Sequence, residues 1–496
     1  MKYKLLSLLG FFLTALGLQA STEYALHFSS ENPRIVNIEA RLLLHQPRIA
    51  MPTGGVPSDI PDGWAAFVHL KSIRLISGEK ISYKSAQEKS SWLLEMDPGQ
   101  EIVIEYQVQL EHDRYNWNQV GGQDARPSLL PGPSTYWVTK GLFIIPANAD
   151  FHPNAIDPVT VSFSLPAHWN ASTAWVAAQK GGQKYNVQNF LSLTNNALMV
   201  GNHAEKTVQH QGMTITWAVS ADLSHRTDLF VNTLGSILPV YHQLFGELPT
   251  TNYLICATVN SFEDGEAFNN SFHQMFTDQD LEFRKVVWAN VLAHEMFHYW
   301  NGTYFLRGKD IQGHYWFSEG FTEYYSNLAL VRAGIVNEST FLQKMSFQFS
   351  RYYNSKFLQP PPHPNLVEAG YNKNNNWGLI YGGGATTAFV LDVQIRFESD
   401  GEHSLDEVMR YLYEHQGKSH TPVTQQHLIE AIKVISGKDY SEFLRSYVNG
   451  LEVLPLITAC EQSGLSMAYY QGEFYLESPQ HSNEIIKSIM AGGRLE

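Results

Sequence analysis

The chain has 496 residues and a formal net charge of −14 at pH 7. A single hydrophobic core seldom extends over so many residues, so we expect two or three domains. The negative charge argues against nucleic acids and anionic membrane surfaces as binding partners.

Residues 1–20 have the features of a secretory signal peptide. Lysines near the start precede an apolar run from Leu5 to Leu18, and Ala20 offers a small-residue cleavage site before Ser21. The alternative is a membrane anchor, but the run is short for a spanning helix, which favours cleavage. We therefore predict an exported protein, periplasmic or secreted, with no stable membrane span after cleavage.

Residues 21–220 have the pattern of an antiparallel β domain. Alternating or β-branched runs at 35–42, 102–110 and 159–165 predict strands. Clusters of proline and glycine, such as the one at 52–55, predict the turns between them.

A helical period replaces the strand pattern after residue 220. We expect a central domain over 221–400, a helical C-terminal subdomain over 401–455 and a short tail over 456–496, and hence a multidomain α+β fold. The expected elements are a helix at 227–245, a strand at 252–259, and helices at 385–397, 424–435 and 440–449, with a capping box at 404–407 that opens another helix. A short hairpin around Gln471-Gly472 is expected in the tail.

The chain contains two cysteines, Cys256 and Cys460. An exported protein could join them, but their spacing does not show whether they meet. Cys256 lies in the apolar run 253–257, which favours a buried free thiol.

The motif H-E-M-F-H at residues 294–298 carries the most specific chemical pattern in the chain. A helix places residues four positions apart on one face, so His294 and His298 can bind one metal ion. The alternative is a buried helix whose histidines are satisfied by hydrogen bonds. Residues 286–293 are apolar on nearly every face, and polar side chains buried in such a helix need partners or a metal.

Two glutamates complete the pattern of a zinc peptidase. Glu319, in the W-F-S-E-G motif at 316–320, would be the third ligand of a catalytic site that keeps one position open. Glu295 would act as general base on a water molecule whose pKa zinc lowers. Glu323 follows Glu319 by one helical turn, and it either hydrogen-bonds a ligand histidine or is a solvated or capping acid.

These residues resemble those of the gluzincin zinc peptidases, more narrowly the glycyl aminopeptidase family and more distantly the aminopeptidase N family. The resemblance covers roughly residues 225–455. It rests on the motifs at 294–301, 316–325 and 381–385. It implies a thermolysin-like catalytic domain behind an N-terminal β domain. It also implies one zinc ion per chain on His294, His298 and Glu319, with Glu295 as the base.

The resemblance also assigns a role to Tyr381. A tyrosine at this position hydrogen-bonds the oxyanion of the tetrahedral intermediate, and a neutral donor in a water-poor site is suited to that task. The alternative is an aromatic core residue. The glycines at 382–384 are expected to let the backbone approach a ligand closely.

Three departures from the family pattern affect the expected function. Gly383 stands where the family usually has lysine, so we expect less positive charge in the cleft. Ala267 stands where a family glutamate holds the amino terminus of the substrate. Glu266, beside Gly265, is one position earlier, and adjacent strand residues point opposite ways unless a slip or bulge intervenes. The PDZ-like domain of many relatives does not fit in the short tail.

We therefore expect a zinc-dependent hydrolase that cleaves peptide bonds, most consistently as an aminopeptidase on short peptides. An endopeptidase on the same scaffold and a non-catalytic zinc-containing binding protein are the alternatives. Arg307, Arg332 and Arg351 are candidates to pair with a peptide carboxylate, and the sequence does not select among them. The side-chain preference and the oligomeric state also stay open.

Overall fold

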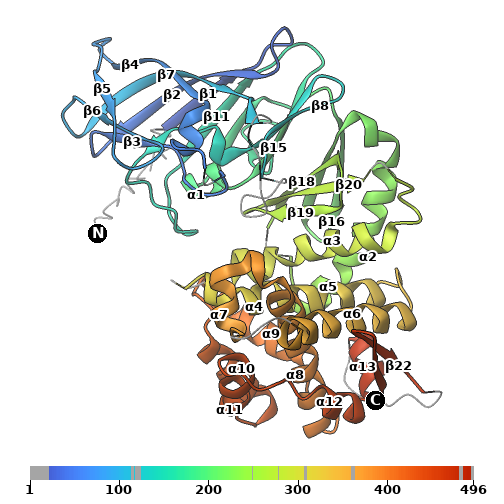
Figure 1. Cartoon of the computed structure of the whole chain (residues 1–496). Coiled ribbons are helices and arrows are strands. Elements are labelled where there is room, and N and C mark those ends of the chain that lie inside the picture. Colours follow the sequence, from blue (N-terminus) through green and yellow to red (C-terminus); the bar gives the residue numbers. More distant parts are fainter. Residues whose placement is uncertain are drawn as a thin grey trace, which may run out of the picture.

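The computed structural model describes residues 22–492, apart from residues 58, 113–114, 116, 118–124, 249, 278, 306–309, 359–362 and 480–483. It confirms the multidomain α+β fold, with β-sheets in the N-terminal part and mostly helices in the C-terminal part (Figure 1). The expected signal peptide lies outside the described residues. Among those that are described, no helix has both the length and the apolarity to cross a membrane.

The N-terminal domain is built around a seven-stranded sheet in the order β13-β14-β11-β1-β2-β7-β4. Its pairs are antiparallel except β1 with β11, which run parallel. The three predicted strands are confirmed as β2, β7 and β11. The bounds are β1 (Thr22–His27), β2 (Ile35–Leu44), β4 (Val68–Leu75), β7 (Gln100–Gln109), β11 (Val159–Ser164), β13 (Val176–Ala177) and β14 (Lys184–Val187).

Two four-stranded sheets complete this domain, in the orders β10-β3-β6-β5 and β12-β15-β9-β8. Their inward side chains share one core with the large sheet, around buried residues such as Trp64 and Trp137. The bounds are β3 (Arg48–Ala50), β5 (Tyr83–Ser85), β6 (Ser91–Leu94), β8 (Ser128–Leu130), β9 (Ser134–Val138), β10 (Ile145–Pro146), β12 (Asn170–Ser172) and β15 (Ala197–Gly201), with the short helix α1 (Phe190–Thr194) and the 3-10 turn η3 (Thr139–Gly141).

A five-stranded sheet in the order β16-β17-β18-β20-β19 joins this domain to the helices. β17, β18 and β20 are parallel, and β19 pairs antiparallel with β20 at one edge. This sheet begins before the predicted domain boundary at residue 220, which stays a prediction. The bounds are β16 (Ala204–His210), β17 (Met213–Val219), β18 (Asn252–Asn260), β19 (Asp264–Ala267) and β20 (Ser271–Thr277).

The helices follow the predicted pattern. α2 ends at Gly246, which adopts φ +83° as a left-handed cap, and α9 begins with the predicted capping box at Ser404. The bounds are α2 (Thr227–Phe245), α3 (Lys285–Phe297), α4 (Tyr315–Ser318), α5 (Gly320–Arg332), α6 (Glu338–Phe357), α7 (Leu366–Ala369), α8 (Gly384–Glu398), α9 (Leu405–Leu412), α10 (Gln425–Ser436) and α11 (Ser441–Phe443), with the 3-10 turn η7 (Gly370–Asn375) and the π-helical turns η8 (Gly378–Gly383) and η10 (Leu444–Val448).

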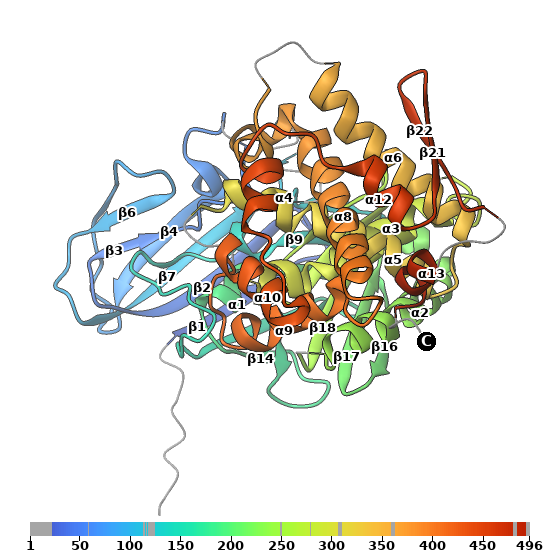
Figure 2. The same ribbon diagram turned by 90° about the horizontal axis from the view of Figure 1, so that it is seen from below.

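The tail packs back onto the helices (Figure 2). It contains α12 (Leu456–Gln462), the hairpin β21 (Ser466–Tyr470) and β22 (Glu473–Glu477), and α13 (Glu484–Ala491). The hairpin is confirmed, with both residues of its turn, Gln471 and Gly472, at positive φ. β22 lies against α6, where the Phe474 amide donates to Ser350 Oγ. Cys256 and Cys460 are both free and buried.

Candidate metal centre and active-site cleft

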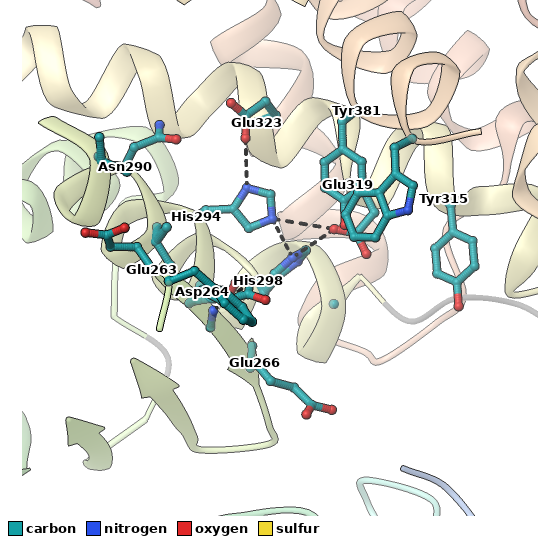
Figure 3. Close-up of a pocket in the computed structure, with 18 of the residues that line it drawn as sticks. Glu263, Asp264, Glu266, Asn290, His294, His298, Tyr315, Glu319, Glu323 and Tyr381 are labelled. Atoms are coloured by element: carbon teal, nitrogen blue, oxygen red, sulfur yellow. Dashed lines mark hydrogen bonds and ion pairs between the residues drawn. The ribbon is translucent and has the colours of Figure 1, made fainter. Parts of the chain in front are cut away.

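α3 positions the histidines because its other faces are held by packing. Buried Trp288, Leu292 and Met296 anchor the helix in a core shared with the five-stranded sheet and α5. Figure 3 shows that His294 and His298 project from this helix toward Glu319. Glu319 lies between α4 and α5, with its side chain 8% exposed.

The donor atoms of these three residues face one point. His294 Nε2 and His298 Nε2 are 3.1 Å apart, and they lie 3.5 and 3.3 Å from Glu319 Oε2. Tetrahedral zinc with donors at about 2.0–2.1 Å separates its ligand atoms by about 3.3 Å. Buried polar atoms this close need protons or a cation between them, and their spacing fits zinc. Within the described residues no other group of histidine, cysteine, aspartate and glutamate converges in this way.

The outer nitrogens of both histidines are held by hydrogen-bond partners. His294 Nδ1 lies 3.3 Å from Glu323 Oε2, and His298 Nδ1 lies 3.2 Å from the Asn301 carbonyl. Glu323 itself accepts from Gln348 Nε2 at 2.7 Å. These contacts set the imidazole orientation. Glu323 is therefore not a solvated acid, but it lies in the first turn of α5, so the choice between a capping acid and a partner of His294 stays a prediction.

Glu295 lies beside the ligands in a tight, buried pocket. A Cβ atom added to Gly265 would lie 2.6 Å from Glu295 Cγ, so only glycine lets β19 approach the carboxylate this closely. Burial raises the pKa of Glu295 to about 8; His294 opposes the rise and Asp264 adds to it.

Tyr381 lies in the cleft on η8. Its ring stacks on Trp377 at 5.0 Å and lies 6.1 Å from the His294 ring. Lys373 from η7 lies 5.3 Å from the centroid of the same ring and donates to Glu319 Oε1 at 2.9 Å. The residues line one cavity of about 1610 Å³, which also contains Glu295 and both histidines.

Comparisons with known proteins agree with this geometry. Residues 287–359 match the family model described as M61 glycyl aminopeptidase. The chain is a metallopeptidase. No curated protein sequence matches it.

The fold of this peptidase is found in solved aminopeptidase structures. An aminopeptidase N family protein from Idiomarina loihiensis superimposes with a TM-score of 0.73 at 19% identity, over 90% of this chain and 79% of that chain. An M1 zinc metallopeptidase from Deinococcus radiodurans bound to a Tyr-Ser-Ala substrate gives 0.58 at 16% identity, over 88% and 94%. Similarity at this identity describes the fold alone.

The expectation that the cleft is less positive than in the family stays a prediction. Gly383 is buried, and a Cβ there would lie 2.7 Å from Leu366, so position 383 packs inside the peptidase. Positive charge comes instead from Lys344, Arg351 and Lys373, which line the cavity. Sequence spacing could not show this, because α6 and η7 meet the site only through tertiary packing.

The glycines after Tyr381 serve helix packing and not ligand approach. A Cβ on Gly384 would lie 2.0 Å from the Trp316 carbonyl oxygen, and one on Gly320 would lie 2.3 Å from the Gly384 Cα. α8 and α5 therefore touch at their first residues. This contact sets the distance between Glu319 and Tyr381, which lie next to it in the chain.

The structure places Glu266 in the cleft but away from the zinc ligands. β19 pairs with β20 in regular register from Asp264 to Ala267, with no bulge to move Glu266 into the expected position. Its carboxylate points away from His294 (Figure 3), and its Oε1 lies 3.8 Å from Lys140 Nζ of the β domain. Its Oε2 is buried without a hydrogen-bond partner among the described residues.

Asp264 is a cleft residue that the sequence analysis did not select. It is two positions from Glu266, so both side chains belong to one face of β19. Burial raises the pKa of Asp264, which His294 and Lys373 partly offset, so its carboxylate lies near the metal centre. The sequence does contain a sign of this: in a strand, Asp264 and Glu266 on either side of Gly265 point to the same face.

The structure also selects among the three candidate arginines. Arg332 pairs with Asp406 at 3.0 Å and donates to the Ile489 carbonyl, away from the cleft. Arg307 lies outside the described residues. Arg351 lines the cavity.

Proposed function

We propose that this peptidase is an aminopeptidase that acts on short peptides. The observation that carries the proposal is the pair of carboxylates on β19, Asp264 and Glu266. A partly buried carboxylate that has an oxygen without a hydrogen-bond donor favours an ammonium group as its partner. Glu266 Oε2 has no hydrogen-bond donor among the described residues, so it supports binding of a free amino terminus.

The β domain supports an exopeptidase for a steric reason. Gly55, Trp117 and Lys140 line the same cavity beside β19. A substrate whose amino end is held at β19 would lie beside these residues, which supports a limit on the residues before the cleaved bond.

The residues divide the reaction between them. Zinc, when held by His294, His298 and Glu319, supplies Lewis-acid polarisation of the scissile carbonyl and acidifies a water molecule. Glu295 accepts the proton of the attacking water and passes it to the leaving nitrogen. Tyr381 donates a hydrogen bond to the charge that develops on the carbonyl oxygen.

Paired peptides with free and acetylated amino termini test this function, with wild type beside Glu295→Gln. We expect cleavage of the free-amine peptides only. Loss of the proton acceptor should reduce kcat by roughly 10²–10⁴-fold while zinc stays bound. Cleavage of both forms would indicate an endopeptidase, and no cleavage by zinc-loaded wild type would indicate a binding protein.

A second set of variants tests the amine anchor. Asp264→Asn and Glu266→Gln should each raise KM for free-amine peptides more than they lower kcat, because they remove ground-state binding. Glu430→Gln, which changes an exposed acid on α10, is the control. Unchanged KM in both anchor variants would remove β19 from the role.

We further propose that the protein is exported and holds one zinc ion per chain. The apolar run at 5–18 supports export, and the single converging ligand group among the described residues supports the stoichiometry. Amino-terminal sequencing of the mature protein should begin at or near Ser21. Metal analysis should return one zinc per chain; a full-length amino terminus or a second tightly bound zinc would contradict these proposals.

A further inference from the structure

Two cations on α6 line the cleft without a carboxylate partner. Lys344 and Arg351 are half-buried wall residues of the cavity. No carboxylate oxygen of a described residue lies within 4.0 Å of either. The other two lysines of the cavity are paired, Lys373 with Glu319 at 2.9 Å and Lys140 with Glu266 at 3.8 Å.

The nearest acid is already occupied. Glu323 is close enough to interact electrostatically with both cations. Its two oxygens, however, are held by His294 at 3.3 Å and by Gln348 at 2.7 Å. The cations therefore keep unused hydrogen-bonding capacity toward the cavity.

The surroundings of the two cations favour an incoming anion. Arg351 stands over the rings of Phe347 and Tyr381 at 5.4 and 5.6 Å, and its Nη1 donates to Gln348 Oε1 at 3.3 Å. These contacts orient the planar guanidinium, which binds carboxylates with two parallel hydrogen bonds. Burial lowers the pKa of both Lys344 and Arg351, because it disfavours their charged forms. An anion that pairs with them offsets this cost of burying a positive charge.

We propose that Lys344 and Arg351 form a subsite for a carboxylate of the substrate, on the leaving-group side of the cut bond. Glu323 and Glu266 lie on opposite sides of His294 (Figure 3), so the cations near Glu323 face the end of the cleft away from the amine anchor. The proposal rests on the proposed function, because amine binding at β19 sets the direction of the peptide. The carboxylate belongs either to a peptide carboxyl terminus or to an acidic side chain after the cut.

The spacing of the cations sets the length of peptide that they accept. Seven residues of α-helix rise about 10 Å, whereas each residue of an extended peptide spans about 3.3 Å. Arg351 is beside Tyr381 and reaches the residue directly after the cut. Lys344 is two turns away on the same face of α6, and it reaches a carboxylate two or three residues further on.

Binding to zinc-loaded Glu295→Gln tests the subsite without turnover. Four peptides are compared by calorimetry: Ala-Ala as free acid, Ala-Ala-amide, Ala-Glu-amide and Ala-Gln-amide. The free acid should bind about 10- to 100-fold more tightly than its amide, as expected for a charge-assisted hydrogen bond. A preference for Ala-Glu-amide over Ala-Gln-amide would instead assign the subsite to an acidic side chain. Equal binding of all four would overturn the proposal.

Variants separate the subsite from direct carboxylate binding by zinc. Arg351→Gln in the Glu295→Gln background should abolish the preference for the carboxylate, and Arg351→Lys should restore part of it. Lys344→Gln should act on tetrapeptides and pentapeptides more than on dipeptides. Lys433→Gln, an exposed cation on α10, is the matched control. A preference that survives both Arg351→Gln and Lys344→Gln would place the carboxylate on the metal and overturn the proposal.

Acetylated peptides distinguish the failure of this proposal from the failure of the proposed function. If acetylation does not weaken binding but amidation does, the amine anchor is wrong and the carboxylate subsite stands. If acetylation weakens binding and amidation does not, the result supports the aminopeptidase proposal and contradicts the carboxylate subsite.

Discussion

Two buried carboxylates lie within reach of His294 and do different work. Glu295 packs against Gly265, where no side chain intervenes. Glu323 contacts the far nitrogen of the imidazole and is in turn held by Gln348. These contacts support the proposed roles, with Glu295 in proton transfer and Glu323 in the orientation of His294.

Glu323→Gln should weaken zinc binding and leave the fold intact. An amide accepts a weaker hydrogen bond than a carboxylate, so the His294 ring is held less firmly. Loss of such a partner typically costs 10- to 100-fold in metal affinity. Competition with a chelator measures the zinc Kd, with Glu430→Gln as the control. An affinity equal to wild type would show that packing alone orients His294.

A histidine far from the cleft gives a pH prediction. His203 Nε2 lies 2.7 Å from Ser172 Oγ in the β domain, and burial lowers the pKa of His203 from 6.5 to about 4. The unfolded chain takes up this proton first as the pH falls, so the contribution is complete above pH 6.5 and is lost toward pH 4. The shift corresponds to about 3 kcal/mol at most.

Denaturant unfolding across this pH range measures the effect. Wild type should lose stability more steeply below pH 6.5 than His203→Gln, which has no titrating group at this position. Parallel curves for the two proteins would show that other groups cause the acid sensitivity.

At the scale of elements, the site depends on how closely two helices approach. α5 begins at Gly320, directly after a metal ligand, and α8 begins at Gly384, directly after η8, which contains Tyr381. The two glycines touch, and neither has space for a Cβ. Their contact therefore transmits any change in helix packing to the distance between Glu319, the proposed ligand, and Tyr381, the proposed oxyanion donor.

Gly384→Ala should destabilise the protein and reduce activity together. The added methyl group meets the Trp316 carbonyl, and overpacking of this kind costs about 1–3 kcal/mol. Gly235→Ala is the control, because it is also helical but has no atom within 4 Å of the added Cβ. That change should stabilise α2 by up to about 1 kcal/mol. Equal stability of the two variants in denaturant unfolding would contradict the packing role.

At the scale of the whole molecule, the cleft lies where three parts of the chain meet. The β domain contributes Lys140, the edge of the five-stranded sheet contributes Asp264 and Glu266, and the helices contribute the metal ligands and α6. The tail packs on the helices of the site: its hairpin contacts α6, and α13 contacts α5 and α8.

Zinc removal should therefore destabilise the helical part and leave the β domain unchanged. Zinc that binds only the folded state at a free concentration a thousand times its Kd contributes about 4 kcal/mol. The predicted ligands all lie at residues 294–319, outside the β domain. Calorimetry with and without chelator should shift one transition and not the other. A uniform shift would mean that the parts unfold as one unit, and no shift after zinc loss would exclude a stabilising role.

Local patterns predicted much of this fold because the physics behind them is local. Alternation located β2, β7 and β11, the turn residues at 471–472 located the hairpin, and the capping box located the start of α9. The helical spacing of His294 and His298 likewise requires them to share a face. The sequence by itself thus determined the zinc chemistry and the class of enzyme.

Tertiary structure decided what surrounds that chemistry. Lys373, Arg351 and Asp264 line the cavity of the metal centre, and they come from elements whose separation in the chain carries no information about distance. Gly383 alone does not describe the charge of the cleft, because the cations Lys344, Arg351 and Lys373 come from other segments. Long-range packing sets which side chains share a cavity, so the amine anchor and the carboxylate subsite become visible only when the folded chain brings β19, α3 and α6 together.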